Sequence, residues 1–291
     1  MYKRILVATG GSPWSDAAVA YATALAAHMG AELRILTVLI MHAAYAMPDM
    51  VASSELVMES VERQGQELLE QAATQAASAG VACTTVCKWG NVPETILQTA
   101  AEEQCDLITL GSRRVSGRKR LWLGSIAGTV AAKAQQPVLV VKQPPPPGGP
   151  ASLLWRRVLV ATGGSPWSDA AVDYTLTLAQ AQQLEVCLLH VDTKRRRPTD
   201  DVGTATAEEK GILTLAEARA AATCVPYEAK LAYGDVTETI LETATSQECD
   251  VIILGSRGLT GWKRLMLGSI SNAVAVKATL PVLIVKRFLL A

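Results

Sequence analysis

Two glycine-containing stretches have the residue types of a backbone site for an anionic ligand, and the chain holds two copies of each. The shorter one is Thr9-Gly10-Gly11-Ser12, which recurs as Thr162-Gly163-Gly164-Ser165. The longer one runs over 111–126 and recurs over 255–270, and both copies end in Gly-Ser-Ile. Glycine lets backbone amides approach a ligand, and a helix start favours negative charge by roughly 0.3 to 2 kcal/mol. The pattern therefore indicates phosphate binding, although glycines also serve ordinary turns and helix caps.

The duplication covers nearly the whole chain. Fourteen residues, Leu6 to Val19, recur without a difference as Leu159 to Val172. Between the copies lies a proline- and glycine-rich run that can neither pair as a strand nor continue a helix, so it should be a short linker. We predict a domain at 1–143, a linker at 144–152 and a domain at 153–291, each long enough to bury its own core.

Both copies alternate short apolar runs with helical patterns, which predicts an α/β fold. In the first copy the predicted strands are 4–8, 33–38, 81–87, 107–110 and 138–141. Helical crossovers between parallel strands place helices on both faces, so each copy should be a doubly wound sheet. The two glycine stretches follow the first and the fourth strand. Because ligands bind beyond the carboxyl ends of such strands, where the strand order reverses, we expect both stretches at one ligand-binding edge.

Charge and hydropathy limit the classes of partner. Lysines plus arginines equal aspartates plus glutamates, 27 of each, which argues against nucleic acid or a membrane surface as the main partner. No apolar run approaches the roughly 18 residues that would span a bilayer. The first residues go straight into a strand pattern without the layout of a signal peptide, so we expect a cytoplasmic location.

The cysteines and histidines do not form a recognisable metal or catalytic pattern. Only Cys105 and Cys249 of the six cysteines are repeat-equivalent, and none has zinc-site spacing, so we interpret the cysteines as buried free thiols. His28, His42 and His190 have no counterparts in the other copy, whereas a duplicated enzyme site would keep such a residue. We therefore interpret the histidines as solvent-facing or packed, and assign no catalytic residue and no metal ligand.

With these motifs the chain resembles a tandem member of the universal stress protein family. Members that bind nucleotides carry a glycine, two residues, a second glycine, nine residues, and then Gly-Ser or Gly-Thr. The second copy matches through Gly255, Gly258, Gly268 and Ser269, whereas the first copy has Arg114 in place of the second glycine. The resemblance implies two α/β domains, each a five-stranded parallel sheet in the order 3-2-1-4-5 with helices on both faces.

The resemblance also implies a site for ATP or another adenine nucleotide, with or without magnesium. Adenine would lie near Val191 and Leu254, the loop after the first strand would border the base and ribose, and the phosphates would meet the second stretch. In the second copy the implied positions are Ala161, Thr162, Gly163, Val191, Leu254, Gly255, Arg257, Gly258, Gly268, Ser269 and Ile270. In the first copy they are Ala8, Thr9, Gly10, Val38, Leu110, Gly111, Gly124, Ser125 and Ile126.

Two departures from the family pattern weaken the implied sites. Nucleotide-binding members usually have an aspartate after the first strand, where this chain has Gly10 and Gly163. Losing a charged hydrogen bond of about 1.5 to 3 kcal/mol would lower the affinity roughly tenfold to a hundredfold. A left-handed backbone at Arg114 would cost about 1 to 2 kcal/mol, although its guanidinium could recover part by contacting phosphate. We expect the second site to be the stronger one.

Other segments leave alternatives open. The basic residues at 118–120 and 263–264 are as consistent with phosphate neutralisation as with a solvated face, and we interpret 194–197 as a solvated loop. The last predicted strands, 138–141 and 282–285, are too apolar to leave in water. In the resembling family the last strands of two domains pair, which implies a pseudo-dimer of the two halves within one chain and leaves a further homodimer open.

The leading hypothesis is a non-catalytic, adenine-nucleotide-binding regulatory protein of the universal stress response. Spacings of six from Gly111 to Gly117 and from Gly255 to Gly261, without a lysine directly after, do not fit a Walker loop. Pro13 and Pro166 occupy the aspartate position of pyrophosphatase-type ATP enzymes. The alternatives are a nucleotide-free dimerising scaffold of the same fold and a slow ATP-hydrolysing enzyme.

Overall fold

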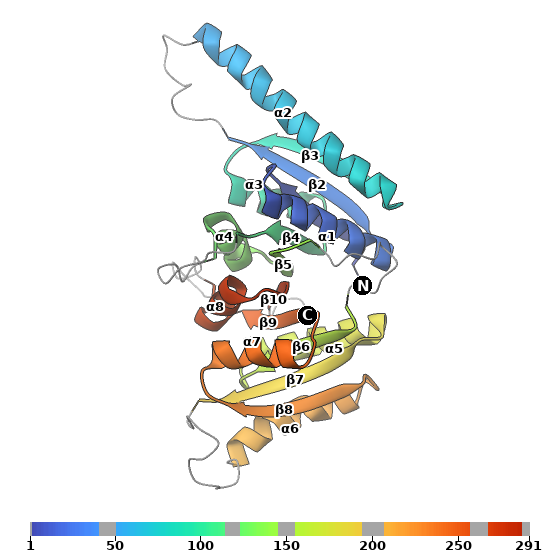
Figure 1. Ribbon diagram of the computed structural model, residues 1–291, viewed down its shortest axis with the longest axis vertical. Helices are drawn as coiled ribbons and strands as arrows, with labels where there is room; N and C mark the ends of the chain where they lie inside the picture. The colour runs from blue at the N-terminus through green and yellow to red at the C-terminus, as the bar shows by residue number, and fades with distance from the viewer. Residues whose placement is uncertain are drawn as a thin grey trace. The chain divides into compact units, whose positions relative to one another are not determined.

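The computed structural model describes residues 2–40, 51–113, 123–144, 155–193, 207–256 and 267–286. Strands and helices alternate through both repeats (Figure 1). The first repeat contains β1 (Arg4–Thr9), α1 (Pro13–Met29), β2 (Glu32–Leu39), α2 (Val51–Ser78), β3 (Cys83–Trp89), α3 (Val92–Glu102), β4 (Leu107–Gly111), α4 (Ser125–Lys133) and β5 (Val138–Val141). The second contains β6 (Arg157–Thr162), α5 (Pro166–Gln182), β7 (Glu185–Asp192), α6 (Ala207–Ala221), β8 (Tyr227–Tyr233), α7 (Val236–Ser246), β9 (Val251–Ser256), α8 (Ser269–Lys277) and β10 (Val282–Lys286).

The chain divides into two compact units that do not follow the sequence repeat. One unit holds β1 to β4 with α1 to α3, and the other holds the whole second repeat together with α4 and residues 138–140 of β5. The first repeat therefore contributes its last helix and most of its last strand to the second unit. The domain bounds given above describe the duplication in the sequence and stay a prediction. Within the described segments, no helix is both long and apolar enough to cross a membrane.

The unit of the first repeat is built around β1. Its strands are parallel and ordered β3-β2-β1-β4, and Val7 of β1 lies between Ile35 of β2 and Thr109 of β4. Ile5, Leu6 and Val7 are fully buried because β1 is covered on both faces, as expected for a central parallel strand. At the far end of β4, the Ser112 amide donates to the Val141 carbonyl at 2.9 Å.

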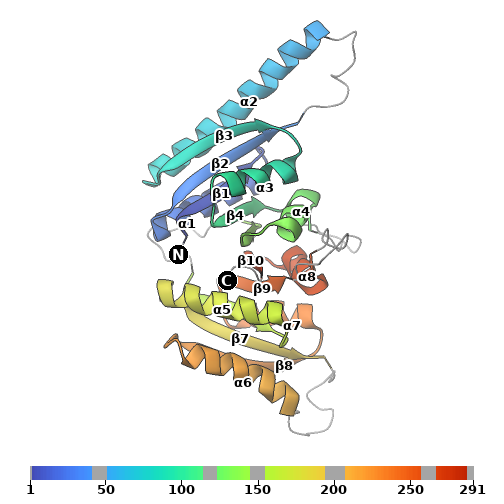
Figure 2. The ribbon, with the colours of Figure 1, turned by 180° about the vertical axis from the view of Figure 1, so that it is seen from behind.

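The second unit contains a complete doubly wound sheet. Its parallel strands are ordered β8-β7-β6-β9-β10, which is the predicted order 3-2-1-4-5. Helices α5 and α6 contact each other, and so do α7 and α8. Figure 1 shows α7 in front of this sheet, whereas Figure 2, from behind, shows α5 in front, so helices cover both faces as predicted.

Strand β5 of the first repeat extends this sheet by pairing antiparallel with β10. Leu139 lies opposite Leu283 and Val138 opposite Ile284, which confirms the predicted pairing of the two last strands. Two further contacts fix the α4–β5 segment to the second repeat. The Leu123 amide donates to the Asn272 side chain at 3.2 Å, and the Lys286 ammonium donates to the Ala132 carbonyl at 3.2 Å. Lys286 also contacts Ser256 Oγ at 3.3 Å.

Candidate functional site

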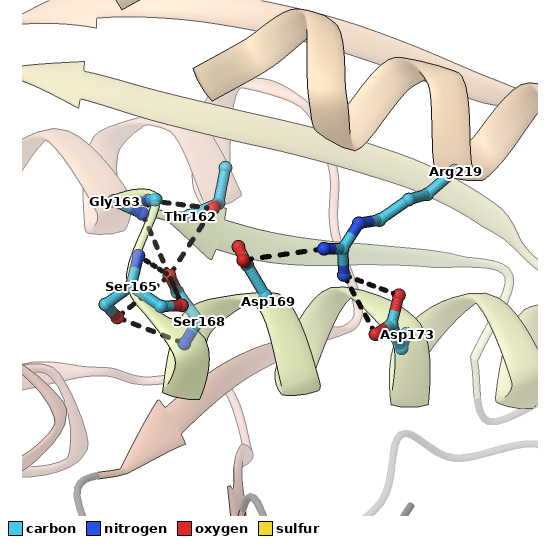
Figure 3. A network of polar contacts seen from close by, with 8 residues as sticks. Thr162, Gly163, Ser165, Ser168, Asp169, Asp173 and Arg219 are labelled. Carbon is cyan, nitrogen blue, oxygen red and sulfur yellow. Dashed lines mark hydrogen bonds and ion pairs between the residues drawn. The ribbon is translucent and has the colours of Figure 1, made fainter. Parts of the chain in front are cut away.

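The loop after β6 is organised by one serine hydroxyl. Ser168 Oγ accepts hydrogen bonds from the amides of Ser165, at 3.0 Å, and Gly163, at 3.3 Å, and donates to the Ser165 carbonyl at 2.9 Å (Figure 3). Ser165 is the N-cap of α5 and Pro166 its first residue, as the Ser-Pro pair predicts. Ser12 and Ser15 form the same capping box in the first repeat. The Gly163 and Ser165 amides are thus engaged within the protein.

The two adjacent glycines of this loop have different roles. Gly164 has a left-handed φ of +69°, and a Cβ there would lie 2.9 Å from Ile212 of α6, so the fold itself requires glycine. Gly163 is exposed, and a Cβ there would meet no described atom within 4 Å. In the first copy, Gly11 corresponds to the packed Gly164 and Gly10 to the open Gly163. The open space therefore lies at Gly10 and Gly163, the positions where the family aspartate is absent.

An ion-pair cluster holds α6 against α5 beside this loop. Both carboxylate oxygens of Asp173 accept from Arg219 Nη1, at 2.9 and 2.8 Å, and Asp169 lies 3.5 Å from Nη2 (Figure 3). These side chains are more than a third exposed, so each pair adds little stability by itself. The cluster nevertheless orients α6, which supplies the Ile212 side chain that lies against Gly164.

Gly255, the penultimate residue of β9, serves packing. A Cβ at Gly255 would lie 2.0 Å from the Trp167 carbonyl oxygen, because the start of α5 passes directly over the strand end. Gly111 meets the Trp14 carbonyl at the same 2.0 Å in the first repeat. A close backbone approach therefore explains both glycines without a ligand. Gly255 also accepts a hydrogen bond at 3.0 Å from Ser271 Oγ, which ties the first turn of α8 to the end of β9.

The start of α8 is open. Gly268 is its N-cap, and no side chain among the described residues caps it there. Ser269 and Ile270 are exposed, and among the described residues a Cβ at Gly268 would have only Ser271 Oγ nearby, at 3.9 Å. The first-turn amides of such a helix start, together with the positive end of its dipole, form a binding surface for an anion. Gly124, Ser125 and Ile126 begin α4 in the same way, in the same compact unit.

Strand β7 supplies two polar residues, His190 and Asp192, that the sequence analysis did not place at the site. Nδ1 of His190 lies 2.9 Å from the Thr162 carbonyl oxygen, where the first repeat has the Thr37 hydroxyl donating to the Thr9 carbonyl at 3.2 Å. His190 is buried, so its interpretation as a packed side chain is confirmed. Asp192 is also buried, at the end of β7, where register places Leu39 in the first repeat. Aligning the second strand of each repeat would have revealed both positions.

The described second-repeat positions meet at one edge of the sheet. Strand β6 lies between β7 and β9, all parallel, so Thr162, Val191 and Leu254 end on the same side. In the first repeat Ala8, Thr9, Gly10, Val38, Leu110 and Gly111 share an edge in the same manner. Arg257, Gly258 and Arg114 lie outside the described residues, as do the basic segments at 118–120, 194–197 and 263–264 and most of the linker.

The cysteines are free, and the structure corrects one expectation about their burial. Cys105, Cys187 and Cys249 are buried, Cys83 and Cys87 are half-buried, and Cys224 is exposed. The prediction of buried thiols is therefore wrong for Cys224, which lies in the turn between α6 and β8. Burial raises the pKa of Cys105 to about 11. No group of three or more metal-binding side chains occurs within the described ranges.

Comparison with known proteins agrees with this architecture. The family model described as the universal stress protein family matches twice, over residues 1–142 and 154–286. Universal stress protein YxiE of Bacillus subtilis is 34% identical over 46% of this chain and 100% of its own length. A universal stress protein of Mycolicibacterium smegmatis is 27% identical over 97% of this chain and 96% of its length. A solved universal stress protein from Archaeoglobus fulgidus superposes with a TM-score of 0.73 over 98% of both chains, at 23% identity, which shows the fold.

Proposed function

Because this chain belongs to the universal stress protein family, we propose that its second repeat is a regulatory, non-catalytic binding module for an adenine nucleotide such as ATP. One observation carries the proposal: α8 begins at the same edge as the open Gly163 position, with exposed Ser269 and Ile270 and with no side-chain cap from the part of the chain that the structure describes. Uncapped amides at a helix start favour a polyphosphate, which brings several negative charges. A cytoplasmic location stays a prediction from the sequence.

The proposed arrangement assigns the base to the ends of β7 and β9 and the phosphates to the start of α8. Adenine would lie against Val191 and Leu254, and the phosphates would lie at Gly268, Ser269 and Ile270. The Ser271 hydroxyl supports this division, because its 3.0 Å bond to Gly255 fixes the helix start to the end of β9. The predicted contacts of Arg257 and Gly258 with the phosphates belong to the same proposal.

The geometry of the loop hydroxyls favours binding over catalysis. Ser168 Oγ already donates to the Ser165 carbonyl while it accepts from two amides. Activating it as a nucleophile would therefore break the cap of α5. His190 is occupied in a similar way, since its Nδ1 lies at the Thr162 carbonyl. Occupancy by ATP would then act through stability or partner contacts, because a ligand that binds only the folded state stabilises that state.

The test compares Gly268→Val with the wild type. Of the side chains that the structure describes, a Cβ at Gly268 meets only the Ser271 hydroxyl, at 3.9 Å, so the variant should fold while its branched side chain covers the first-turn amides. We expect millimolar ATP to raise the melting temperature of the wild type and not that of Gly268→Val, with no magnesium-dependent phosphate release from either. The matched control is Gly124→Val at the start of α4. Flat calorimetry of the wild type with ATP would end the proposal.

A nucleotide-free scaffold is the second candidate, because packing explains Gly164 and Gly255 and neither repeat has the family aspartate. The β5–β10 pairing would then be what the fold provides. Protein purified without added ligand distinguishes the candidates: acid denaturation should release an adenine nucleotide from a binding module and none from a scaffold. Phosphate release that is lost in Gly268→Val would instead support slow hydrolysis.

A further inference from the structure

The last helix of the first repeat contacts both ends of the longer glycine stretch of the second repeat. Where β9 ends, the Lys286 ammonium donates to Ser256 Oγ at 3.3 Å, and it also donates to the Ala132 carbonyl, in the last turn of α4, at 3.2 Å. Where α8 begins, the Asn272 side chain accepts from the Leu123 amide at 3.2 Å. All five residues belong to one compact unit. Leu123 and Ala132 lie at opposite ends of α4, so one helix reaches both ends of the stretch.

These contacts are buried and join stiff elements. The exposed fractions of Ser256 and Lys286 are 1% and 3%, and those of Leu123 and Asn272 are 5% and 8%. A buried donor that loses its acceptor costs free energy, so such hydrogen bonds are kept in the folded state. Helix α4 has nine residues and is therefore roughly 14 Å long, at 1.5 Å per residue. It thus fixes the spacing between the end of β9 and the start of α8.

The first repeat does not reproduce these contacts. Ser112 is the counterpart of Ser256, and its buried hydroxyl has no hydrogen-bond partner among the described residues. Gly128 stands where the second repeat has Asn272, so α4 has no side chain that could accept from the Leu267 amide in return. The side-chain contacts between the two repeats are therefore not symmetric, and they act on the glycine stretch of the second repeat.

We propose that Lys286 and Asn272 are positioning residues through which α4 of the first repeat pre-organises the nucleotide site of the second repeat. This inference rests on the proposed function, in which the phosphates bind at the start of α8. Backbone amides bind an anion best when they already point at it, because ordering them at the moment of binding costs affinity. The contacts with α4 hold the start of α8 and the end of β9 in place before the ligand arrives. The affinity of the second repeat for ATP therefore depends on the first repeat.

The hydrogen bonds of Lys286 can be tested separately from its charge. An ammonium beside the stretch attracts an anionic ligand whether or not it holds Ser256. Ser256→Ala removes the hydrogen bond and keeps the charge. Lys277→Met removes a charge and keeps the hydrogen bond, because Lys277 is exposed at the end of α8 and pairs with Glu238 of α7. The two variants together assign the effect of Lys286→Met to the hydrogen bond or to the charge.

The test is isothermal titration of the whole chain with ATP. Asn272→Ala and Lys286→Met should each weaken binding roughly fivefold to tenfold, which is a typical coupling between two parts of a protein. Ser256→Ala should weaken it by a similar factor, and Lys277→Met should bind as the wild type does. Hydrogen exchange without ATP checks the design of the first variant: the Leu123 amide should be protected in the wild type and exchange faster in Asn272→Ala.

Leu178→Ala separates positioning from a general loss of stability. Leu178 is fully buried near the end of α5 that lies away from the ligand-binding edge, so this variant should melt at a lower temperature and bind ATP unchanged. A flat titration of the wild type would end the proposed function and this inference with it. Wild-type binding with unchanged affinity in both Asn272→Ala and Ser256→Ala would overturn this inference alone. So would a Leu178→Ala variant that loses as much affinity as Asn272→Ala.

Discussion

The loops after β1 and β6 are nearly superimposable in conformation, whereas the strands beside them have diverged. Ser12 and Ser165 have φ of −93° and −91° and the same ψ of 152°, and both form the capping box. On the second strand of each repeat, Arg34 is replaced by Cys187, Thr37 by His190 and Leu39 by Asp192. The two repeats have therefore kept the same loop after the first strand, whereas the second strand beside that loop differs between them. Differences in ligand binding beside these two loops should originate on β2 and β7.

The largest expected effect tests whether the two repeats share the same packing. Gly255→Ala places a methyl group 2.0 Å from the Trp167 carbonyl, so α5 or β9 must move, at a cost of about 3 kcal/mol or more. Gly111→Ala should cost as much, because it meets Trp14 at the same distance. Gly163→Ala, in open space, is the control. Urea unfolding measures all three, and an unchanged midpoint in Gly255→Ala would contradict the packing role.

The next largest effect is a change in the pH dependence of stability, caused by Lys286, which holds α4 to the second repeat. Burial lowers the pKa of Lys286 from its ordinary 10.5 to about 8. The unfolded chain therefore binds more protons between about pH 8 and 10.5, and stability should rise with pH across this window by as much as about 3 kcal/mol. Lys286→Met should remove that part of the rise in thermal unfolding profiles.

Lys277→Met is the control for that profile. A hydrogen bond with Glu238 raises the pKa of the exposed Lys277, so its contribution is present below pH 10.5 and is lost only above it. The variant should keep the rise between pH 8 and 10.5. Identical slopes for wild type and Lys286→Met would show that Lys286 does not titrate as its burial requires.

A third change restores the missing carboxylate to the second repeat. Gly163 is outside the left-handed region and its Cβ would meet nothing, so Gly163→Asp should fold normally. If ATP binds here, a charged hydrogen bond of about 1.5 to 3 kcal/mol should raise the affinity tenfold or more. Gly10→Asp makes the same change in the first repeat and should have the smaller effect. Isothermal titration with ATP compares them, and weaker binding by Gly163→Asp would count against the proposed position of the ribose.

The smallest effect tests whether His190 and Thr37 are interchangeable. His190→Ala removes the group at the Thr162 carbonyl and should cost about 1 to 3 kcal/mol, whereas His190→Thr should recover most of this by donating as Thr37 does. Thermal unfolding at constant pH provides the measurement. Equal losses in both variants would mean that the imidazole ring, and not its hydrogen bond, is what the second repeat needs.

The fold was largely accessible from the sequence because its signals are local. The apolar runs, the Ser-Pro helix starts and the duplication together predict the parallel strands, the caps and the two repeats, and the resemblance to the family implies the strand order. The third strand shows where local signals mislead: the sequence predicts that it begins at Val81, but it begins at Cys83. The Val81 amide instead donates to the Ala76 carbonyl, after the left-handed Gly80, and so closes α2. A valine that ends a helix cap looks the same in the sequence as one that starts a strand.

The candidate site was less accessible because its details depend on tertiary contacts. Gly255 belongs to the nucleotide signature, yet its need for glycine follows from the Trp167 carbonyl, far away in the sequence. His190 and Asp192 become neighbours of the site only through the register of β7 with β6 and β8. The sequence pattern indicates which loops lie at the ligand-binding edge of the sheet. The register between neighbouring strands decides which side chains lie beside those loops.

The antiparallel contact of β5 with β10 has a consequence for any fragment cut at the linker. A piece holding only β6 to β10 would leave the backbone of Val282, Leu283 and Ile284 without the partner that β5 supplies. Open, apolar strand borders recruit other chains. Such a half should therefore self-associate.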